Sequence, residues 1–300
     1  MTREENYSFK DLNMPITARE FTADIEDFVH IPSVCLRINE MANNPRFSAI
    51  DMANEIAKDP MTMARVMRMA NSPYYHFPAK VDNLTRAITI IGTQDLQDML
   101  LMVALRAATE QSQPTLIDLD NYWKHSLFVG LMAKRLAGMI STPVLGRDRL
   151  FVAGVLHEFG RIVFAQKIPE LFKVMLNRAM NQQEPFYEIE RLVFGIDHTE
   201  ISLEIMNRWL YPARLSTVIR YQHHPVRAGD QRLEASLLLL ADHASAIAGL
   251  PGIGEDGQTE ELARAMQFCG VTERLMDDAI ELARNDYFEL LPVFMQRKTA

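Results

Sequence analysis

The chain has 300 residues, of which 48% are hydrophobic and 23% charged, and its formal net charge is −8. This composition excludes a disordered chain and supplies enough apolar residues for one large domain or two modest ones. The acidic balance comes without a basic stripe. It argues against a nucleic-acid partner, because duplex-binding proteins cluster lysine and arginine against phosphates.

The apolar runs and the cysteines indicate where in the cell the protein works. Residues 1–15 lack the apolar core of a signal peptide, and no apolar run approaches the roughly 20 residues that span a bilayer. Cys35 and Cys269 lie far apart and do not have the spacing of a metal site, so we expect both to be reduced and buried. We therefore expect a cytoplasmic protein with no membrane partner.

The first half of the chain contains short helices separated by proline and asparagine. Helices are predicted, after a loose tail at 1–14, at about 18–28, 33–42, 48–58, 61–70, 84–91 and 94–108. Ser48 with Asp51 three residues later is close to a capping box, and Pro60 suits the first turn of the helix that follows. No run shows sustained alternation between hairpin turns, so the predicted fold class is all-α.

The helices at 84–91 and 94–108 are joined by Gly92 and superficially resemble a helix-turn-helix. Asp95 and Asp98 stand near the start of the second helix, where a recognition helix meets phosphates. Ordinary antiparallel packing is therefore favoured over DNA binding. This half offers no glycine-rich phosphate loop, no nucleophile–base pair and no cofactor fingerprint.

A polar segment around Pro114 is the best subdomain boundary. We predict an N-terminal helical subdomain at 15–112, a second at 113–250 and a C-terminal helical extension at 251–300. Helices are predicted in the later parts at about 120–140, 148–157, 162–165, 171–181, 186–194, 199–209, 215–222, 234–248, 260–269 and 272–291. A turn-rich link at 250–257 precedes the last two.

Titratable side chains gather between positions 125 and 243, where six of the eight histidines lie. His157 and Glu158 follow the apolar run 150–156, and burying an imidazole beside a carboxylate is costly unless both find partners. The other candidates on separate predicted helices or at their ends are His125, His198, His223, His224 and Asp242. Helical bundles build metal sites from one such ligand on each of several helices. A His-Glu pair by itself is more often a hydrogen-bonded helix end.

The order His125, His157-Glu158, Asp242 resembles the His…His-Asp…Asp pattern of the HD superfamily of metal-dependent phosphohydrolases. His198 and the pair His223-His224 resemble the additional ligands of the HD-GYP branch, which degrades cyclic di-GMP. Adjacent residues of a regular helix point about 100° apart, so both histidines of that pair cannot face one metal unless the helix ends there.

The wider sequence resembles the HDOD domain, a relative found in bacterial signalling proteins that often lost catalysis. The resemblance covers about residues 15–250 and is carried by 59–65, 70–72, 87–92, 123–126, 153–157 and 190–198. Two departures stand out. Glu158 replaces the superfamily's aspartate, whereas metal–ligand distances tolerate only a few tenths of an ångström, and the Gly-Tyr-Pro loop is absent. Arg161 stands where the family usually has lysine or arginine and is a candidate phosphate ligand.

The mixture of imidazole and carboxylate predicts one or two divalent transition metal ions (iron, manganese, zinc or nickel), or a degenerate pocket with none. The resemblance implies a non-catalytic signal-transduction module that binds a protein partner or a small phosphorylated ligand. The alternative is a phosphohydrolase acting on a nucleotide or cyclic dinucleotide, in which two metals activate a bridging water. An open coordination position beside a basic pocket would favour the enzyme.

Overall fold

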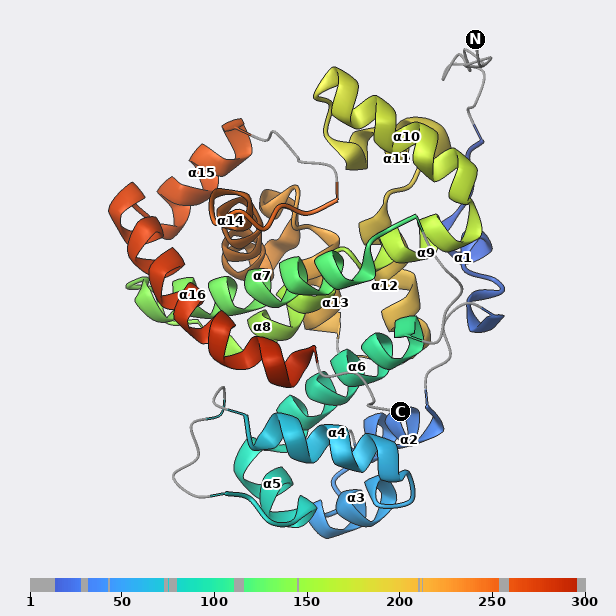
Figure 1. The fold of residues 1–300 in the computed structure, drawn as a ribbon, viewed down its shortest axis with the longest axis vertical. Coiled ribbons are helices and arrows are strands. Elements are labelled where there is room, and N and C mark those ends of the chain that lie inside the picture. The colour runs from blue at the N-terminus through green and yellow to red at the C-terminus, as the bar shows by residue number, and fades with distance from the viewer. Residues whose placement is uncertain are drawn as a thin grey trace.

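The computed structural model describes residues 14–27, 32–42, 44–72, 75, 80–110, 116–144, 146–209, 211, 213–253 and 259–295. The predicted tail before Met14 lies outside the described residues. Every regular element in these ranges is a helix, which confirms the all-α class (Figure 1). The exact partition into subdomains stays a prediction.

The first group of helices forms a small bundle, at the bottom of Figure 1, together with one helix that leads away from it. These helices are α2 (Ser33–Ala42), α3 (Ala49–Ile56), α4 (Pro60–Ala70), α5 (Leu84–Ile91) and α6 (Thr93–Glu110). The capping box at Ser48 and Asp51 is present, and Asp59 caps α4 ahead of Pro60. Local sequence therefore sets these helix starts as predicted.

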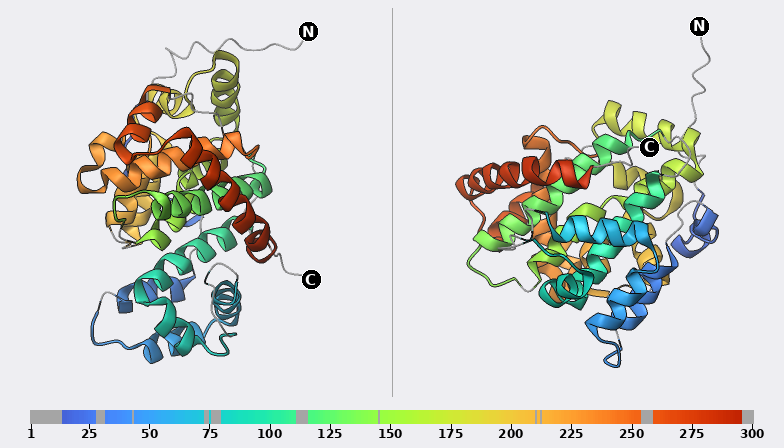
Figure 2. Two further views of the ribbon diagram at one scale, coloured as in Figure 1. Left: turned by 90° about the vertical axis from the view of Figure 1, so that its left-hand side faces the viewer. Right: turned by 60° about the horizontal axis from the view of Figure 1, so that its bottom comes forward.

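The helix predicted at 18–28 is shorter than expected. Among the described residues of this range, α1 (Ala18–Phe21) forms and a 3-10 turn follows at Ile25–Asp27. Phe28, the last predicted residue, lies outside the described residues. The Thr22 hydroxyl donates to the Ala18 carbonyl, which also accepts the helical hydrogen bond from the Thr22 N–H at the end of α1. α1 packs on α12 of the second half. Figure 2 shows the N-terminal bundle and the larger helical body from two further sides.

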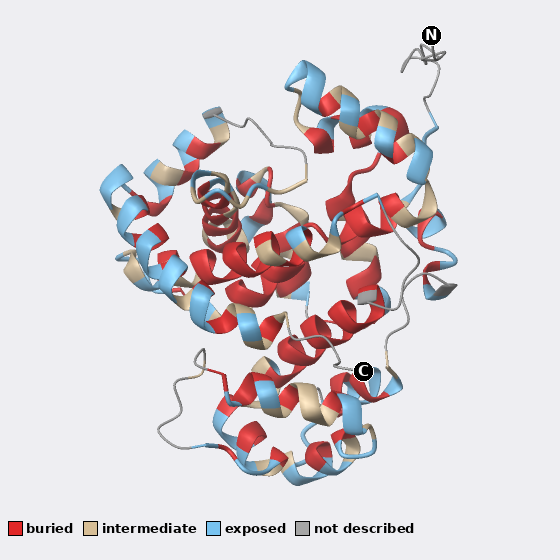
Figure 3. Ribbon diagram, viewed as in Figure 1, coloured by how far each residue is buried: buried red, intermediate tan, exposed pale blue. Residues whose placement is uncertain are grey.

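The second half is a larger helical body. Its helices are α7 (Leu119–Met139), α8 (Arg147–Leu156), α9 (Phe159–Lys167), α10 (Pro169–Gln182), α11 (Phe186–Phe194), α12 (His198–Arg208), α13 (Ala213–Arg220), α14 (Arg232–Ile247), α15 (Thr259–Cys269) and α16 (Glu273–Phe294). α7 runs through the middle and packs on α8, α14 and α16, and its core-facing residues are buried (Figure 3).

Helices α7 and α8 touch through their backbones. A Cβ atom added at Gly154 would stand 2.5 Å from the Gly130 Cα and 2.8 Å from the Val129 carbonyl carbon. Such a distance leaves no room for any side chain between the two helices. The crossing fixes the position of His125 on α7 relative to His157, which ends α8.

Helix α6 joins the two halves. It packs on α2, α4 and α5 on the bundle side and on α8 of the larger body. Its residues from Leu96 to Thr109 are buried, so this helix presents no face to a DNA groove. Buried Asp98 accepts a hydrogen bond from Arg149 of α8, 3.2 Å between Oδ2 and Nε, which ties the halves together.

Among the described residues, no single helix has the length and apolar character to cross a membrane. The pair α5–α6, bent by 112°, meets that test by length and composition only.

We expect Gly154→Ala to destabilise the protein by about 1–3 kcal/mol or more, because the new methyl group overlaps backbone atoms that cannot rotate away. Thermal and urea unfolding measure the change. Gly138→Ala on the same α7 is the matched control: its Cβ meets only Arg147 Nη1 at 3.6 Å, and alanine favours a helix over glycine. Equal effects in the two variants would contradict the close crossing.

Asp98 makes stability depend on pH. Burial raises the pKa of Asp98 from 3.8 to about 6, although Arg149 acts in the opposite direction. A carboxyl group with a raised pKa favours the folded state when protonated. The contribution of Asp98 to the free energy of unfolding, about 3 kcal/mol, is complete below pH 4 and is lost as the pH rises through 6.

The Asp98→Asn variant keeps a neutral group at this position. We expect its stability relative to the parent protein to increase between pH 4 and pH 7 in urea unfolding. The exposed Asp277→Asn variant on α16 controls for a general effect of charge. Parallel pH profiles of parent and Asp98→Asn would disprove this assignment.

Candidate metal centre

Three side chains from separate helices meet at one point. They are His125 of α7, His157 at the end of α8 and Asp242 of α14, and both histidines are buried. Their ligand atoms lie 3.3 Å apart for the two Nε2 atoms and 3.4 Å from each Nε2 to Asp242 Oδ1. The structure thus brings together residues that are 117 positions apart in the sequence (125 to 242).

These distances match the coordination geometry of a transition metal. Tetrahedral zinc with bonds of about 2.0–2.1 Å separates its ligand atoms by roughly 3.3–3.4 Å. Near the same point, Glu158 Oε2 is buried without a hydrogen-bond partner, 3.7 Å from His125 Nε2. Two imidazoles, a carboxylate and an unsatisfied buried oxygen fit one divalent cation.

The other ring nitrogen of each histidine is held by a backbone carbonyl. His157 Nδ1 donates to the Gly154 carbonyl at 2.7 Å, and His125 Nδ1 donates to the Leu250 carbonyl at 2.9 Å. The Ser245 hydroxyl also lies 3.1 Å from His125 Nδ1. These bonds leave the Nε2 atom of each ring directed at the cluster, as metal-binding histidines require.

His157 and Asp242 of the cluster shift each other's pKa values toward their charged forms. Burial alone lowers the pKa of His157, but the Asp242 carboxylate beside it raises the pKa above its ordinary value. Burial likewise raises the pKa of Asp242, but the His157 and His125 rings hold that pKa well below its usual range. The carboxylate is therefore ionised and ready to bind a cation.

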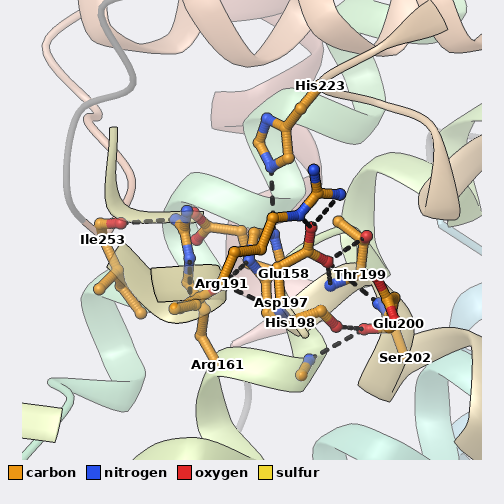
Figure 4. Close-up of polar contacts among 12 residues, drawn as sticks. Glu158, Arg161, Arg191, Asp197, His198, Thr199, Glu200, Ser202, His223 and Ile253 are labelled. Carbon is orange, nitrogen blue, oxygen red and sulfur yellow. Dashed lines mark hydrogen bonds and ion pairs between the residues drawn. The ribbon is translucent and has the colours of Figure 1, made fainter. Parts of the chain in front are cut away.

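Glu158 lies at the edge of the cluster and faces Arg161 as well. Its Oε1 accepts from Arg161 Nη1, and the arginine together with His125 lowers the pKa of Glu158 despite its burial. Arg161 also donates to the Ile253 carbonyl, and its Nε lies 3.5 Å from Glu190 Oε1 (Figure 4). Arg161, the predicted phosphate ligand, is only 1% exposed, and two carboxylates neutralise its charge.

A second polar group surrounds His198, the first residue of α12. His198 Nδ1 donates to Glu190 Oε2 at 2.7 Å, and its Nε2 lies 3.2 Å from the Gln222 amide nitrogen. The same Nε2 lies 3.3 Å from His223 Nε2 (Figure 4). Burial lowers the pKa of His223 well below its ordinary value, so this ring is neutral. The His223 ring stacks on the Tyr187 ring, with the ring centroids 4.3 Å apart.

Of the seven predicted ligands, the cluster contains His125, His157 and Asp242. Glu158 is adjacent to it, and His198 and His223 form the separate group around Glu190. His224 is half-buried and meets the edge of Tyr187, with ring centroids 5.6 Å apart. The neighbouring histidines thus have different surroundings, as their geometry at a helix end requires.

A segment of backbone covers the cluster. This cover segment, residues 250–253, follows α14, and Leu250, Gly252 and Ile253 contact the site, while the Asp242 side chain stays 23% exposed. Leu250 accepts from His125, Ile253 accepts from Arg161, and a Cβ at Gly252 would lie 3.0 Å from both His125 Nε2 and Glu158 Oε1. Only a residue without a side chain allows the backbone to approach the cluster so closely.

The family follows from comparison with known sequences. A model of the HDOD domain matches residues 29–225, which are 197 of the 300 residues. The chain belongs to the HDOD family. Its resemblance to that domain is thereby confirmed. Asp242 and the cover segment both lie beyond the end of the matched region.

Solved structures share the fold of this HDOD chain. An HDOD domain protein of unknown function from Geobacter sulfurreducens has a TM-score of 0.72 at 20% identity, covering 96% of this chain and 99% of that one. A candidate phosphohydrolase from Shewanella amazonensis SB2B has 0.68 at 21%, covering 91% and 97%. A candidate signal-transduction protein from Marinobacter aquaeolei VT8 has 0.69 at 23%, covering 96% and 64%.

At these identities the likeness shows the fold alone. Among curated proteins, an uncharacterized protein of Treponema pallidum (strain Nichols) is 23% identical over 207 residues, or 69% of this chain. That match covers 40% of the other protein, so the HDOD chain spans about two fifths of the length of the curated relative it matches.

Sequence reasoning missed several residues that hold the HDOD site together. Glu190 stands in the apolar helix α11, and a buried acid on an inward face was its available signal. Gln222 donates to the His157 carbonyl at 2.9 Å and also reaches His198, but its sequence position gives no indication of this. The backbone carbonyls of Gly154 and Leu250 orient the two histidine rings, and no side chain in the sequence marks them for this role.

We expect Gly252→Ala to weaken zinc binding by about tenfold or more. The methyl group would displace His125 or the cover segment by a few tenths of an ångström, which metal–ligand distances do not tolerate. Competition with a chromogenic chelator measures the dissociation constant. Pro251→Ala changes an exposed neighbour in the same segment and should bind zinc as the parent does. An unchanged constant for Gly252→Ala would show that the segment does not press on the ligands.

Proposed function

We propose that this HDOD protein is a non-catalytic regulatory module that binds one divalent transition metal at His125, His157 and Asp242. The observation that carries the proposal is the cover segment, which lies on the ligand cluster and accepts hydrogen bonds from His125 and Arg161. The similarity in fold to a candidate signal-transduction protein is consistent with this role.

The covered cluster argues against hydrolysis of a phosphoester. A hydrolytic metal needs an open coordination position with a basic substrate pocket beside it. Here the backbone at Gly252 lies so close that an added Cβ atom would stand 3.0 Å from His125 Nε2, and the neighbouring Arg161 is engaged by Glu158, Glu190 and the Ile253 carbonyl. A substrate phosphate would have to displace both arrangements.

The second histidine group argues against a two-metal reaction. His198 has both ring nitrogens in hydrogen-bonding contacts, with Glu190 on one side and Gln222 and His223 on the other. Glu190 also faces Arg161. Placing a second ion there would require breaking these contacts, so one metal is the better fit.

A bound ion would supply a cross-link between α7, α8 and α14. The chain's own residues then have defined tasks: Gly154 and Leu250 orient the two imidazoles, and Glu158 with Arg161 anchors the cover segment through Ile253. The partner of such a module is a protein or a small phosphorylated ligand, bound outside the covered cluster.

The test is elemental analysis of protein purified without a metal-affinity step, combined with an assay on bis-p-nitrophenyl phosphate and cyclic dinucleotides. We expect about one transition metal ion per chain and no turnover above that of the His157→Ala/Asp242→Ala variant. Metal-free, folded parent protein would contradict the metal centre. Turnover that disappears in the variant would instead support a metal-dependent phosphohydrolase, the alternative that the His/His/Asp cluster favours.

A further inference from the structure

A cavity of about 290 Å³ lies between α7, α16 and the start of α8. α16 packs on α7, and each helix presents one face to the cavity (Figure 1). The lining residues recur at intervals of four and three positions, among them Leu131, Arg135 and Gly138 on α7 and Leu282, Asp286 and Glu289 on α16. The volume is close to the lower end of the roughly 300–1,000 Å³ that ligand sites occupy, so the cavity suits a small molecule.

The two helices run antiparallel along the cavity. Trp123 near the start of α7 lies against Phe294 at the end of α16, with ring centroids 6.1 Å apart, whereas Arg135 further along α7 pairs with the earlier Asp286. Positions that rise along α7 therefore fall along α16. The Arg135–Asp286 pair consequently lies in the middle of the cavity, with one end of the cavity on either side of it.

One end of the cavity carries a cation without a partner. A Cβ atom built at Gly138 would stand 3.6 Å from Nη1 of Arg147, which is the first residue of α8. The exposed Arg147 side chain makes no hydrogen bond, ion pair or ring contact in the part of the chain that the structure describes. The neighbouring Lys134, by contrast, is paired with Asp148 at 2.7 Å. A positive charge in the first turn of a helix opposes the helix dipole, so the stability of α8 does not explain this arginine.

The other end of the cavity carries an acid. Glu289 stands one turn after Asp286 on α16, and its carboxylate is exposed. Asp286 accepts from Nε and Nη2 of Arg135 and raises the pKa of that guanidinium, and Glu289 adds to the effect through space. Among the described residues, Glu289 has no hydrogen bond or ion pair of its own. Because Asp286 already neutralises Arg135, Glu289 remains able to bind a cation.

The spacing of the two charges sets the length of a ligand. Leu282 and Glu289 are seven residues apart (282 to 289), which is about 10 Å along a helix. Gly138, where the Arg147 guanidinium lies, is likewise seven residues from Leu131 (131 to 138). An extended tripeptide spans about 10 Å between its termini, because each residue extends by roughly 3.3–3.6 Å.

Apolar side chains lie between the charged ends. Leu131 and Leu290 are buried and form part of the lining, and Leu282 is 39% exposed beside them. An apolar group in the middle of a ligand can pack on these leucines and remove their surface from water.

We propose that the cavity between α7 and α16 binds a small zwitterionic molecule of tripeptide length, with its carboxylate at Arg147 and its ammonium group at Glu289. The opposite charges at the two ends select the orientation as well as the class of ligand. The proposal goes beyond the regulatory role described above and does not depend on a bound metal.

The test is a saturation-transfer NMR titration of the full chain with the tripeptide Ala-Leu-Ala, its N-acetyl form and its C-terminal amide, at constant ionic strength. Each modified form lacks one of the two terminal charges. We expect saturable binding of the free tripeptide and a dissociation constant that is about threefold higher, or more, for each modified form, as the loss of one exposed ion pair predicts.

Variants of the two charged residues assign the ends. Arg147→Gln should abolish the preference for the free carboxylate over the amide and keep the preference for the free amine. Glu289→Gln should do the reverse. The matched controls are Arg274→Gln and Glu281→Gln, which remove exposed charges from α16 outside the cavity and should keep both preferences. Thermal unfolding verifies that all four variants fold.

Three results would overturn the proposal. They are absence of saturable binding of the free tripeptide, equal binding of the free and modified forms by the parent protein, and equal losses of preference in the cavity variants and their controls.

Discussion

The backbone contact between α7 and α8 is the constraint on which the rest of the site depends. Gly130 and Gly154 bring the two helix axes close enough for His125 and His157 to share a cluster. The Gly154 carbonyl then orients the His157 ring, so one residue sets both the packing and the direction of a ligand. α14 completes the arrangement by packing on α7 and delivering Asp242.

A second constraint is the neutralisation of buried charge. Arg161 is almost completely buried, which is tolerable only because Glu158 and Glu190 approach it from two sides. The same carboxylates also belong to the surroundings of the two histidine groups, since Glu158 lies beside His125 and Glu190 holds His198. The arginine thus connects the groups and fastens the cover segment through the Ile253 carbonyl.

Most helices follow from local sequence. α5 begins and ends where predicted, and the caps at Ser48, Asp59 and Asp197 are present because their side chains bond to nearby N–H groups. The helix at 18–28 was predicted too long, because α1 ends at Phe21 and packs on α12 of the second half. The packing of α1 on α12 is a tertiary contact, which periodicity along the chain does not contain.

The sequence by itself determined the helical class, the family resemblance and the set of imidazoles and carboxylates from which a metal cluster can form. These properties reside in residue type and in spacing along the chain. Only the tertiary structure decided that His125, His157 and Asp242 meet, that Arg161 is neutralised, and that residues 250–253 cover the cluster. Each of these depends on distances between helices and on backbone carbonyls, which every residue has and which no pattern of side chains identifies.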